Sequence, residues 1–287
     1  MNGPFRTVKQ QGVTLVELMI ALTLGAVVIA GVVQIFLSGQ QSYRLQRGLG
    51  LVQDNGRTAV FFLHRGLRIA GLPREGGPGI LQGIVWANDD SGAPATRDGA
   101  NQNDPDVVTV MYQSATNCLG QRTDSYPAAQ LMQDPAGNFY TKDQYFIGPS
   151  TVGVAQLSLR CRALGLDNQQ VEARTAALVD GIEDIQFLYG VDLLDATGVA
   201  ATPTTRDFQI ERYMSATAIN ALANPAAAWD SVVSIRFAVL STSLNNALDE
   251  PADTQFKLLD DETRAAFDDR IFRRVFRSTV EVRNSTP

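Results

Sequence analysis

The amino-acid sequence predicts an α+β protein in which one long N-terminal helix packs on an antiparallel β-sheet head. Two observations predict it: an uninterrupted apolar segment near the N-terminus that runs on into a helical pattern, and a series of short alternating runs in the second half of the chain. Of the 287 residues, 45% are hydrophobic, and they are most concentrated in the apolar segment before residue 40. This uneven spread divides the chain into an apolar N-terminal part and a more polar remainder.

The apolar segment from Val13 to Leu37 contains a single charged residue, Glu17. A helix of this length can cross a hydrocarbon core of about 30 Å, so we expect a membrane-spanning helix. The residues before it carry Arg6 and Lys9 and no acid, and basic residues tend to stay on the cytoplasmic side. We therefore expect a single-pass protein of the inner membrane whose C-terminal head lies in the periplasm.

Three kinds of N-terminal segment compete for this pattern. A secretory signal has its small-residue cleavage site after the apolar run, but here the run continues into further helical pattern. A plain membrane anchor has no use for Glu17, because an ionised carboxylate in hydrocarbon is costly and usually marks a function. The third kind is a signal that is cleaved before the apolar run, as in the prepilins.

The residues around Gly12 carry a specific motif. Gly12 is followed by the sequence VTLVEL, which begins at Val13 and contains Glu17, and this motif resembles the class III signal of type IV prepilins and type II secretion pseudopilins. The resemblance implies that a prepilin peptidase cuts between Gly12 and Val13 and methylates the new amine of Val13, where the family usually has Phe. It also implies a leader at 1–12, a transmembrane and assembly helix at 13–70 and a periplasmic β-rich head at 71–287, in a type IV pilin fold.

The chemistry of these positions agrees with that interpretation. Gly12 has no Cβ, so its backbone can approach the carboxylates of a protease closely. When helices are offset along a filament axis, Glu17 of one subunit can reach the Val13 amine of the next and pair two charges that are each costly alone in hydrocarbon. We expect this pair to set the register between subunits.

An amphipathic helical pattern continues beyond the apolar segment. Apolar residues recur at spacings near three and four, at Leu45, Leu49, Val52, Ala59, Leu63 and Leu67,. We expect the helix to end at Gly71, with Pro73 just beyond it. The glycines inside it, Gly25, Gly31, Gly48, Gly50 and Gly56, are either points where the helix unwinds during assembly or places where helices pack closely, and the sequence favours neither.

Short alternating runs after a Gly/Pro-rich loop at 73–105 predict the strands of the head. The apolar positions that share a strand face are Val108, Val110 and Tyr112; Leu157, Leu159 and Cys161; Ile185, Phe187 and Tyr189; Val233, Ile235, Phe237 and Val239; and Phe276, Val280 and Val282. The intervening positions are polar, at Arg160, Arg162, Asp184, Gln186, Arg236, Arg277, Glu281 and Arg283. We therefore expect one face of the sheet to be wet and the other to cover the amphipathic half of the helix.

Cys118 and Cys161 are the only two cysteines. In an oxidising compartment an even pair is expected to form a disulfide, and two free buried thiols are the alternative. The loop at 73–105 has neither the setting of a nucleotide site nor the spacing of an EF-hand, so we predict no metal and no cofactor.

Phrases in the head resemble the PilW family of minor pilins. They are LVDGIED from Leu178, LYGVD from Leu188, RVFRSTV from Arg274 and VRN from Val282. The resemblance implies a complex with other minor pilins that primes pilus assembly. The segment 241–270 fits no pattern that the sequence allows us to assign.

No catalytic residues are predicted. The single histidine, His64, lies on the amphipathic helix, and the neighbouring carboxylates Glu183 and Asp184 point to opposite faces of a strand,. The formal net charge is −6, and the arginines of 270–277 are embedded among acids, so nucleic acid is not an expected partner.

The sequence thus predicts a minor pilin, not an enzyme, that acts in a priming or tip complex for type IV pili and later reaches the cell surface in the pilus. Its expected partners are the prepilin peptidase, other minor pilins, the major pilin, a pilus-tip adhesin and the inner membrane. A type II secretion pseudopilin is the alternative, and a tip adhesin or ligand-binding pilin is a further one. The size of the head favours a low-copy subunit over the repeating component of the shaft.

Overall fold

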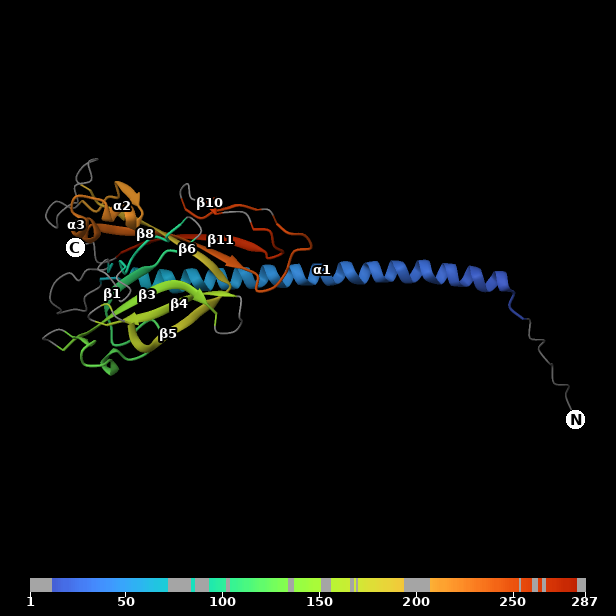
Figure 1. Ribbon diagram of the computed structural model, residues 1–287, viewed down its shortest axis with the longest axis horizontal. Coiled ribbons are helices and arrows are strands. Elements are labelled where there is room, and N and C mark those ends of the chain that lie inside the picture. The colour runs from blue at the N-terminus through green and yellow to red at the C-terminus, as the bar shows by residue number, and fades with distance from the viewer. Residues whose placement is uncertain are drawn as a thin grey trace, which may run out of the picture. The chain divides into compact units, whose positions relative to one another are not determined.

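The computed structural model describes residues 12–71, 84–85, 93–101, 104–133, 137–150, 156–165, 168, 170–193, 207–252, 254–259, 263–264 and 267–282. Contacts divide the chain into two compact units, Met1–Gln46 and Arg47–Pro287. The first contains the apolar part of the N-terminal helix. The second contains the rest of that helix and both β-sheets (Figure 1).

Helix α1 runs from Leu15 to Arg68 and confirms the predicted long helix to within two residues at each end. It ends where the sequence predicts, because Gly71 has a left-handed backbone with φ of 72°, a conformation that favours glycine. The Gly71 N–H donates to the Met111 carbonyl at 2.6 Å, which ties the helix end to the first strand. Pro73, the second predicted stop signal, lies outside the described residues.

The first sheet is antiparallel, with the order β1-β3-β4-β5 and β2 paired beside β3. Its strands are β1 (Val108–Gln113), β2 (Met132–Gln133), β3 (Phe139–Pro149), β4 (Leu157–Leu164) and β5 (Gln170–Asp180). The short helix η1 (Thr123–Ser125) lies in the connection between β1 and β2. Part of the predicted loop 73–105 runs beside β1, since Ile84 forms a bridge to Val110 and Arg97 forms one to Val107.

The second sheet is also antiparallel and has the order β11-β8-β6-β7. Its strands are β6 (Ile182–Val191), β7 (Arg212–Met214), β8 (Val232–Thr242) and β11 (Arg273–Glu281). Helices α2 (Ala216–Asn220) and α3 (Pro225–Asp230) connect β7 to β8, and β9 (Phe256–Lys257) pairs with β10 (Thr263–Arg264) between β8 and β11. The described part of the head therefore has two large sheets and the short β9–β10 pair, whereas the sequence pattern predicts a single sheet.

Gly181 joins the two sheets, and this position explains the LVDGIED phrase. Its N–H donates to Leu157 of the first sheet, and its carbonyl accepts from Thr242 of the second. Its φ is 70°, and a Cβ there would lie 2.9 Å from the Thr242 carbonyl oxygen. Only glycine meets both conditions, so the chain can pass from β5 to β6 in a single residue.

The main core lies between α1 and the apolar faces of both sheets. It contains Ala59, Leu63 and Leu67 from α1 together with most of the apolar strand positions predicted from the sequence, among them Val110, Leu159, Phe187, Phe237 and Val280. The Ser241 hydroxyl of β8 donates to the Val52 carbonyl of α1 at 3.0 Å, in a buried hydrogen bond. The prediction that a sheet face covers the amphipathic half of the helix is confirmed.

The predicted wet face is wrong for the second sheet. On β6, Asp184 is fully buried and Gln186 is 4% exposed. A second apolar cluster, formed by residues of β6, β8 and the 241–270 segment, is also buried. The cluster consists of Leu188, Ala238, Leu240, Leu258 and Leu259, with Tyr213, Phe256, Phe267 and Val275 packed against it. The cause is the segment 241–270, which the sequence left unassigned and which lies over this face of the sheet.

Other residues at the predicted wet positions vary in exposure. Arg277 and Glu281 are exposed, Arg160, Arg162 and Arg236 are half-buried, and Arg283 lies outside the described residues. The alternating pattern therefore predicts the inner face of the strands well but overstates how much of the outer face meets water.

Candidate functional site

The bond between Gly12 and Val13 lies in an exposed, non-helical segment directly before α1. Val13 is 72% exposed, and no atom lies within 4 Å of the place where a Cβ on Gly12 would stand. Helix α1 begins only at Leu15. The bond expected to be cut is therefore one residue outside the capped helix, where a protease can bind it in an extended form.

Thr14 and Glu17 cap the start of α1 reciprocally. The Glu17 N–H donates to the Thr14 hydroxyl oxygen at 3.3 Å, and the Thr14 N–H donates to the Glu17 carboxylate at 3.4 Å. The Thr14 hydroxyl also lies 3.4 Å from the same carboxylate oxygen. This is a capping box, in which a Thr and a Glu three residues later satisfy two helix-end donors. The sequence analysis missed it, although the T-x-x-E signal is present in TLVEL.

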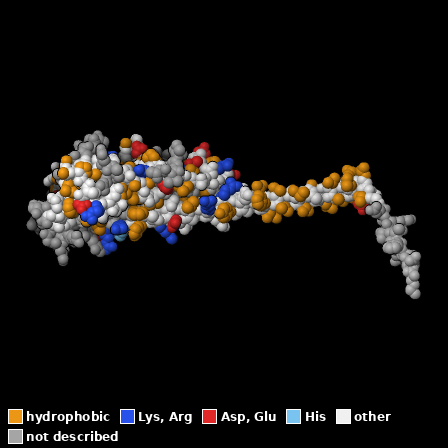
Figure 2. Space-filling model, turned by 90° about the horizontal axis from the view of Figure 1, so that it is seen from below, with side chains coloured by type: hydrophobic (Ala, Val, Ile, Leu, Met, Phe, Trp, Pro, Cys, Tyr) orange, Lys and Arg blue, Asp and Glu red, His pale blue; other side chains and the backbone are white. Residues whose placement is uncertain are grey.

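The apolar part of α1 has no partner among the described residues of this single chain. Its large side chains, from Val13 to Leu37, are each about half exposed or more, and hydrophobic atoms cover this stretch of the helix in Figure 2. It is a helix long and apolar enough to cross a membrane. Its only charge, Glu17, is engaged with Thr14, which offsets part of the cost of placing a carboxylate in an apolar setting.

Glycines on the head half of α1 allow close approach by other elements. A Cβ on Gly56 would lie 2.1 Å from the Phe276 ring of β11, and one on Gly48 would lie 2.6 Å from Ala247. By contrast, a Cβ on Gly25, Gly31 or Gly50 would meet nothing within 4 Å. Of the two explanations that the sequence leaves open, close packing holds for Gly48 and Gly56, although a strand and a loop pack there instead of a second helix.

Cys118 and Cys161 form a disulfide, as predicted, so the alternative of two free thiols is wrong. Their Cα atoms are 6.5 Å apart, and the bond joins the loop after β1 to β4. Both cysteines pack into the main core. The disulfide therefore fixes two non-adjacent parts of the first sheet to each other.

Asp143 lies beneath this disulfide and is fully buried. Its carboxylate accepts hydrogen bonds from the hydroxyls of Tyr112 and Thr141 and from the Cys118 N–H. Burial raises the pKa of Asp143 to about 7, although these donors act in the opposite direction,. Its carboxylate and the two sulfur atoms lie within 4.8 Å of one another, but sulfurs bonded to each other offer no thiolate to a metal.

Three other acids, Asp192, Asp207 and Glu211, have carboxylate oxygens within 4.8 Å of one another, close enough to hold a cation. Each of them also accepts a backbone N–H nearby. Asp192 accepts from Phe208 at 3.0 Å, Asp207 from Gln209 at 2.9 Å, and Glu211 from Leu193 at 2.6 Å. These hydrogen bonds give the cluster a structural role, because they connect the end of β6 to the start of β7.

Two of the arginines in 270–277 are engaged within the head. Arg273 forms ion pairs with Glu183 and Asp269, each at 2.6 Å, and its guanidinium carbon lies 3.6 Å from the centre of the Phe267 ring. Arg277 donates to the carbonyls of Lys257 and Leu258. These side chains fix the 241–270 segment to the second sheet. Glu183, which pairs with Arg273, thus has a structural role.

The single histidine, His64, is half-buried on α1.

Comparisons with known proteins agree with this arrangement. Residues 8–33 match the prokaryotic N-terminal methylation motif, and residues 144–284 match the family described as Type IV Pilus-assembly protein W. Among solved structures, a type IV-like pilin from Thermus thermophilus is 14% identical, with 82% of this chain and 98% of that chain covered at a TM-score of 0.42. No curated protein sequence matches the chain.

A methylation motif at the start of a single apolar helix, followed by an antiparallel β head, defines a type IV pilin-like membrane protein. The head carries the second match, which begins in β3 and extends through β11. Over residues 144–284 the chain matches the PilW family of type IV pilus-assembly proteins. Both resemblances predicted from the sequence are confirmed.

Proposed function

We propose that this chain is a low-copy minor pilin of the complex that primes pilus assembly or forms the pilus tip. The observation that carries the proposal is the combination of a prepilin N-terminus at 8–33 with a PilW head at 144–284 in one chain. The first part supplies processing and a helix for the filament core. The second supplies a head of the kind named for pilus assembly.

The shape of the head supports a low copy number. Close-packed helices lie about 8–10 Å apart. A layer packed on a sheet lies about 10 Å from it, so each sheet adds about that much to the width of the head around α1. The two sheets of this head both pack on the C-terminal half of α1, so the head is wider than the spacing of close-packed helices. Identical neighbours would collide unless they were well offset along the axis, and a few different partners avoid this constraint.

One face of α1 remains open in the head and is available to such partners. Phe61 is 60% exposed on this face, and Arg57 and Arg65, one helical turn away on either side, are exposed as well. A large exposed aromatic side chain between cations is unusual on the surface of a monomer and is typical of an interface. This surface supports contact with neighbouring pilin helices.

Processing between Gly12 and Val13 belongs to the same proposal. Gly12→Val should block cleavage, because the added side chain obstructs the exposed backbone on which a protease must close. The N-terminal sequence of membrane-extracted protein should begin at methylated Val13 in the wild type and at Met1 in the variant. An intact Met1 in wild-type cells that make pili would contradict this step.

Glu17 is proposed to pair with the Val13 amine of a neighbouring subunit after cleavage, when the capping interaction with Thr14 can be exchanged for a charged partner,. Glu17→Ala should leave the chain processed and bound to the membrane but poor at assembly. Glu17→Gln keeps a capping acceptor without the charge, so it should restore the helix start but not the assembly.

Deletion of the gene tests the role as a whole. Surface pili should fall sharply, and blocking retraction at the same time should partly restore them, because a priming defect slows initiation and leaves elongation possible. Complementation with the wild type should restore pili, whereas Gly12→Val should not. Immunogold labelling should be sparse or at the tips.

Two outcomes would contradict the proposal. Even labelling along the shaft, at a stoichiometry near that of the major pilin, would identify a shaft subunit. Normal pili together with a loss of secreted hydrolases would identify a type II secretion pseudopilin.

A further inference from the structure

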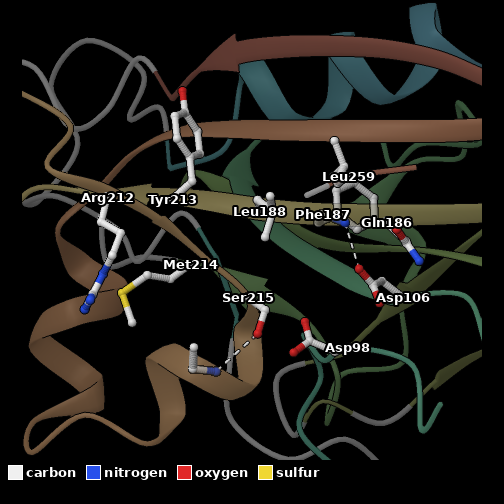
Figure 3. A pocket seen from close by; sticks show the side chains of 11 residues that line it. Asp98, Asp106, Gln186, Phe187, Leu188, Arg212, Tyr213, Met214, Ser215 and Leu259 are labelled. Carbon is white, nitrogen blue, oxygen red and sulfur yellow. Dashed lines mark hydrogen bonds between the residues drawn. The ribbon is translucent and has the colours of Figure 1, made fainter. Parts of the chain in front are cut away.

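A cavity of about 370 Å³ opens on the outer face of the second sheet. It lies between β6, β7, the start of α2 and Leu259 of the 241–270 segment (Figure 3). Leu188, Met214 and Leu259 give it apolar walls, and Asp98, Asp106 and Gln186 line it with polar groups. Met214 also belongs to the main core, and none of these residues lies in the N-terminal assembly segment.

Asp106 brings a buried carboxylate to the cavity. It is 7% exposed, and its two oxygens accept the Gly99 N–H at 2.8 Å and the Phe187 N–H at 2.7 Å. Within the described part of the chain, no lysine or arginine pairs with it. Burial raises the pKa of Asp106 well above its usual value, and the nearby Asp98 adds to this effect. The ionised form of Asp106 is thus disfavoured in this structure, and a cation in the cavity would stabilise it.

Asp98 is held in place beside the same cavity. Its carboxylate accepts the N–H groups of Ala216 at 2.9 Å and Thr217 at 2.8 Å, at the start of α2. A carboxylate has about four acceptor positions, so both acids keep the capacity to accept further hydrogen bonds. Their backbone donors fix their orientation in advance, which lowers the cost of ordering a bound ligand.

Gln186 gives independent evidence that a donor is missing. It is 4% exposed, and its Oε1 atom has no hydrogen-bond partner among the described residues. Leaving a buried acceptor unpaired costs about 1–3 kcal/mol, and native proteins rarely do so without a reason. The cavity therefore combines three sets of acceptors with apolar walls.

We propose that this cavity receives the arginine side chain of a neighbouring pilin subunit. A guanidinium has five donors in a planar fork, which can serve Asp98, Asp106 and Gln186 from one position. Its aliphatic stem matches the apolar walls. Among the described residues, Arg212 is the only cation that lines the cavity, and it points away from both carboxylates in Figure 3. The identity of the partner as a pilin rests on the proposed function, whereas the chemistry of the site does not.

The test uses the purified full-length protein in detergent and three small probes followed by saturation-transfer NMR. The probes are N-acetyl-arginine methylamide, the corresponding lysine compound, and the citrulline compound, which has the shape of arginine without its charge. The arginine probe should bind saturably. The citrulline and lysine probes should bind at least about 5-fold more weakly, because neither provides a charged planar fork.

Variants locate the site. Asp106→Asn should weaken binding of the arginine probe about 10-fold, the value expected for loss of one charge-assisted hydrogen bond. Because this change can disturb the fold, Ala218→Phe is the second variant: it leaves every acceptor in place and fills the cavity from α2, so it should abolish binding. Asp124→Asn is the control, since Asp124 pairs with Arg122 on the surface of the other sheet, and it should bind like the wild type.

Several results would overturn the proposal. No saturable binding of the arginine probe would remove the site, equal binding of citrulline would show that charge is not recognised, and equal binding of lysine would remove the assignment to arginine. Binding unaffected by Ala218→Phe would place it elsewhere. None of these measurements involves pili, so this proposal and the proposed function can each fail alone.

Discussion

The two parts of α1 differ in composition and in surroundings: the part up to Gln46 is largely apolar, whereas the part from Arg47 to Arg68 is amphipathic. In the part up to Gln46, apolar residues and glycines alike lack contacts with other elements of the described chain. In the part from Arg47 to Arg68, one face is fully buried, with Val52, Ala59 and Leu63 at 0% exposure. Apolar side chains on one face of the second part are thus covered by the head, whereas those of the first part are left for a membrane or other subunits to cover. The structural role of a glycine in this helix therefore depends on whether another element packs against it, as at Gly48 and Gly56.

The largest effect that separates the two parts should come from the disulfide. Replacing both Cys118 and Cys161 by Ala opens a link between residues 43 positions apart, and a loop of that size is worth about 4 kcal/mol of unfolding free energy. Urea unfolding of the full-length protein in detergent measures this loss, with near-UV circular dichroism to follow the head and far-UV circular dichroism to follow helix content. Helical signal from the apolar part of α1 should persist, and its loss together with the head would contradict the comparison.

Side chains two positions apart on α1 should differ next most. Leu63→Ala empties a fully buried site and should cost about 3 kcal/mol,. Phe61→Ala removes a side chain that is 60% exposed and should change stability by less than about 0.5 kcal/mol, while reducing pilus assembly. The comparison would break if Phe61→Ala lowered the urea midpoint as much as Leu63→Ala.

Glycine substitutions give the sharpest form of the comparison. Gly56→Ala places a methyl group 2.1 Å from the Phe276 ring and should destabilise the head by about 2 kcal/mol through overpacking. Gly50→Ala meets nothing within 4 Å and should stabilise the protein by about 0.5–1 kcal/mol, because alanine favours the helix. Opposite shifts of the melting temperature are the expected result, and shifts of the same sign would refute the packing role of Gly56.

The pH dependence of stability should come from the head. The pKa of Asp143 is about 7 in the folded state and near the ordinary 3.8 when unfolded. The folded state therefore holds the proton more tightly, and the unfolding free energy should fall as pH rises from about 4 to about 7, by at most about 1.4 kcal/mol per pH unit for this group. Asp106 acts in the same direction.

Asp143→Asn is the variant that isolates this effect. It should reduce the slope between pH 4 and 7 by about one proton in urea titrations. An unchanged slope would mean that another group is responsible. Asp124→Asn, which alters an exposed acid in the same sheet region, serves as the control.

Much of this fold could be predicted because its signals are local. The apolar run after Gly12, the stop at Gly71 and the alternation in β6 and β8 each depend on neighbouring residues in the sequence. The disulfide could be predicted because two cysteines in an oxidising compartment allow only one intramolecular pair. The capping role of Thr14 was not predicted although its T-x-x-E signal is local, because a charge at Glu17 within an apolar run also fits a contact with another subunit.

The rest depends on contacts that no local pattern encodes. The burial of Asp184 and Gln186 follows from the 241–270 segment, whose few apolar residues, such as Leu258 and Leu259, show no period. The buried Asp143 becomes visible only once β1 and β3 pair. The cavity at Asp98 and Asp106 likewise combines segments separated by about a hundred residues.

The position of β11 has a consequence for biosynthesis. This strand is the last of the described strands, yet it pairs with β8 along its whole length and places Phe276 against Gly56 of the first helix. The N-terminal helix can enter a membrane early during synthesis, but its fit to the head waits until β11 has been made. A chain interrupted before Arg273 would therefore be anchored with β8 and the Gly56 surface uncovered. Such a product should be recognised and degraded by proteases.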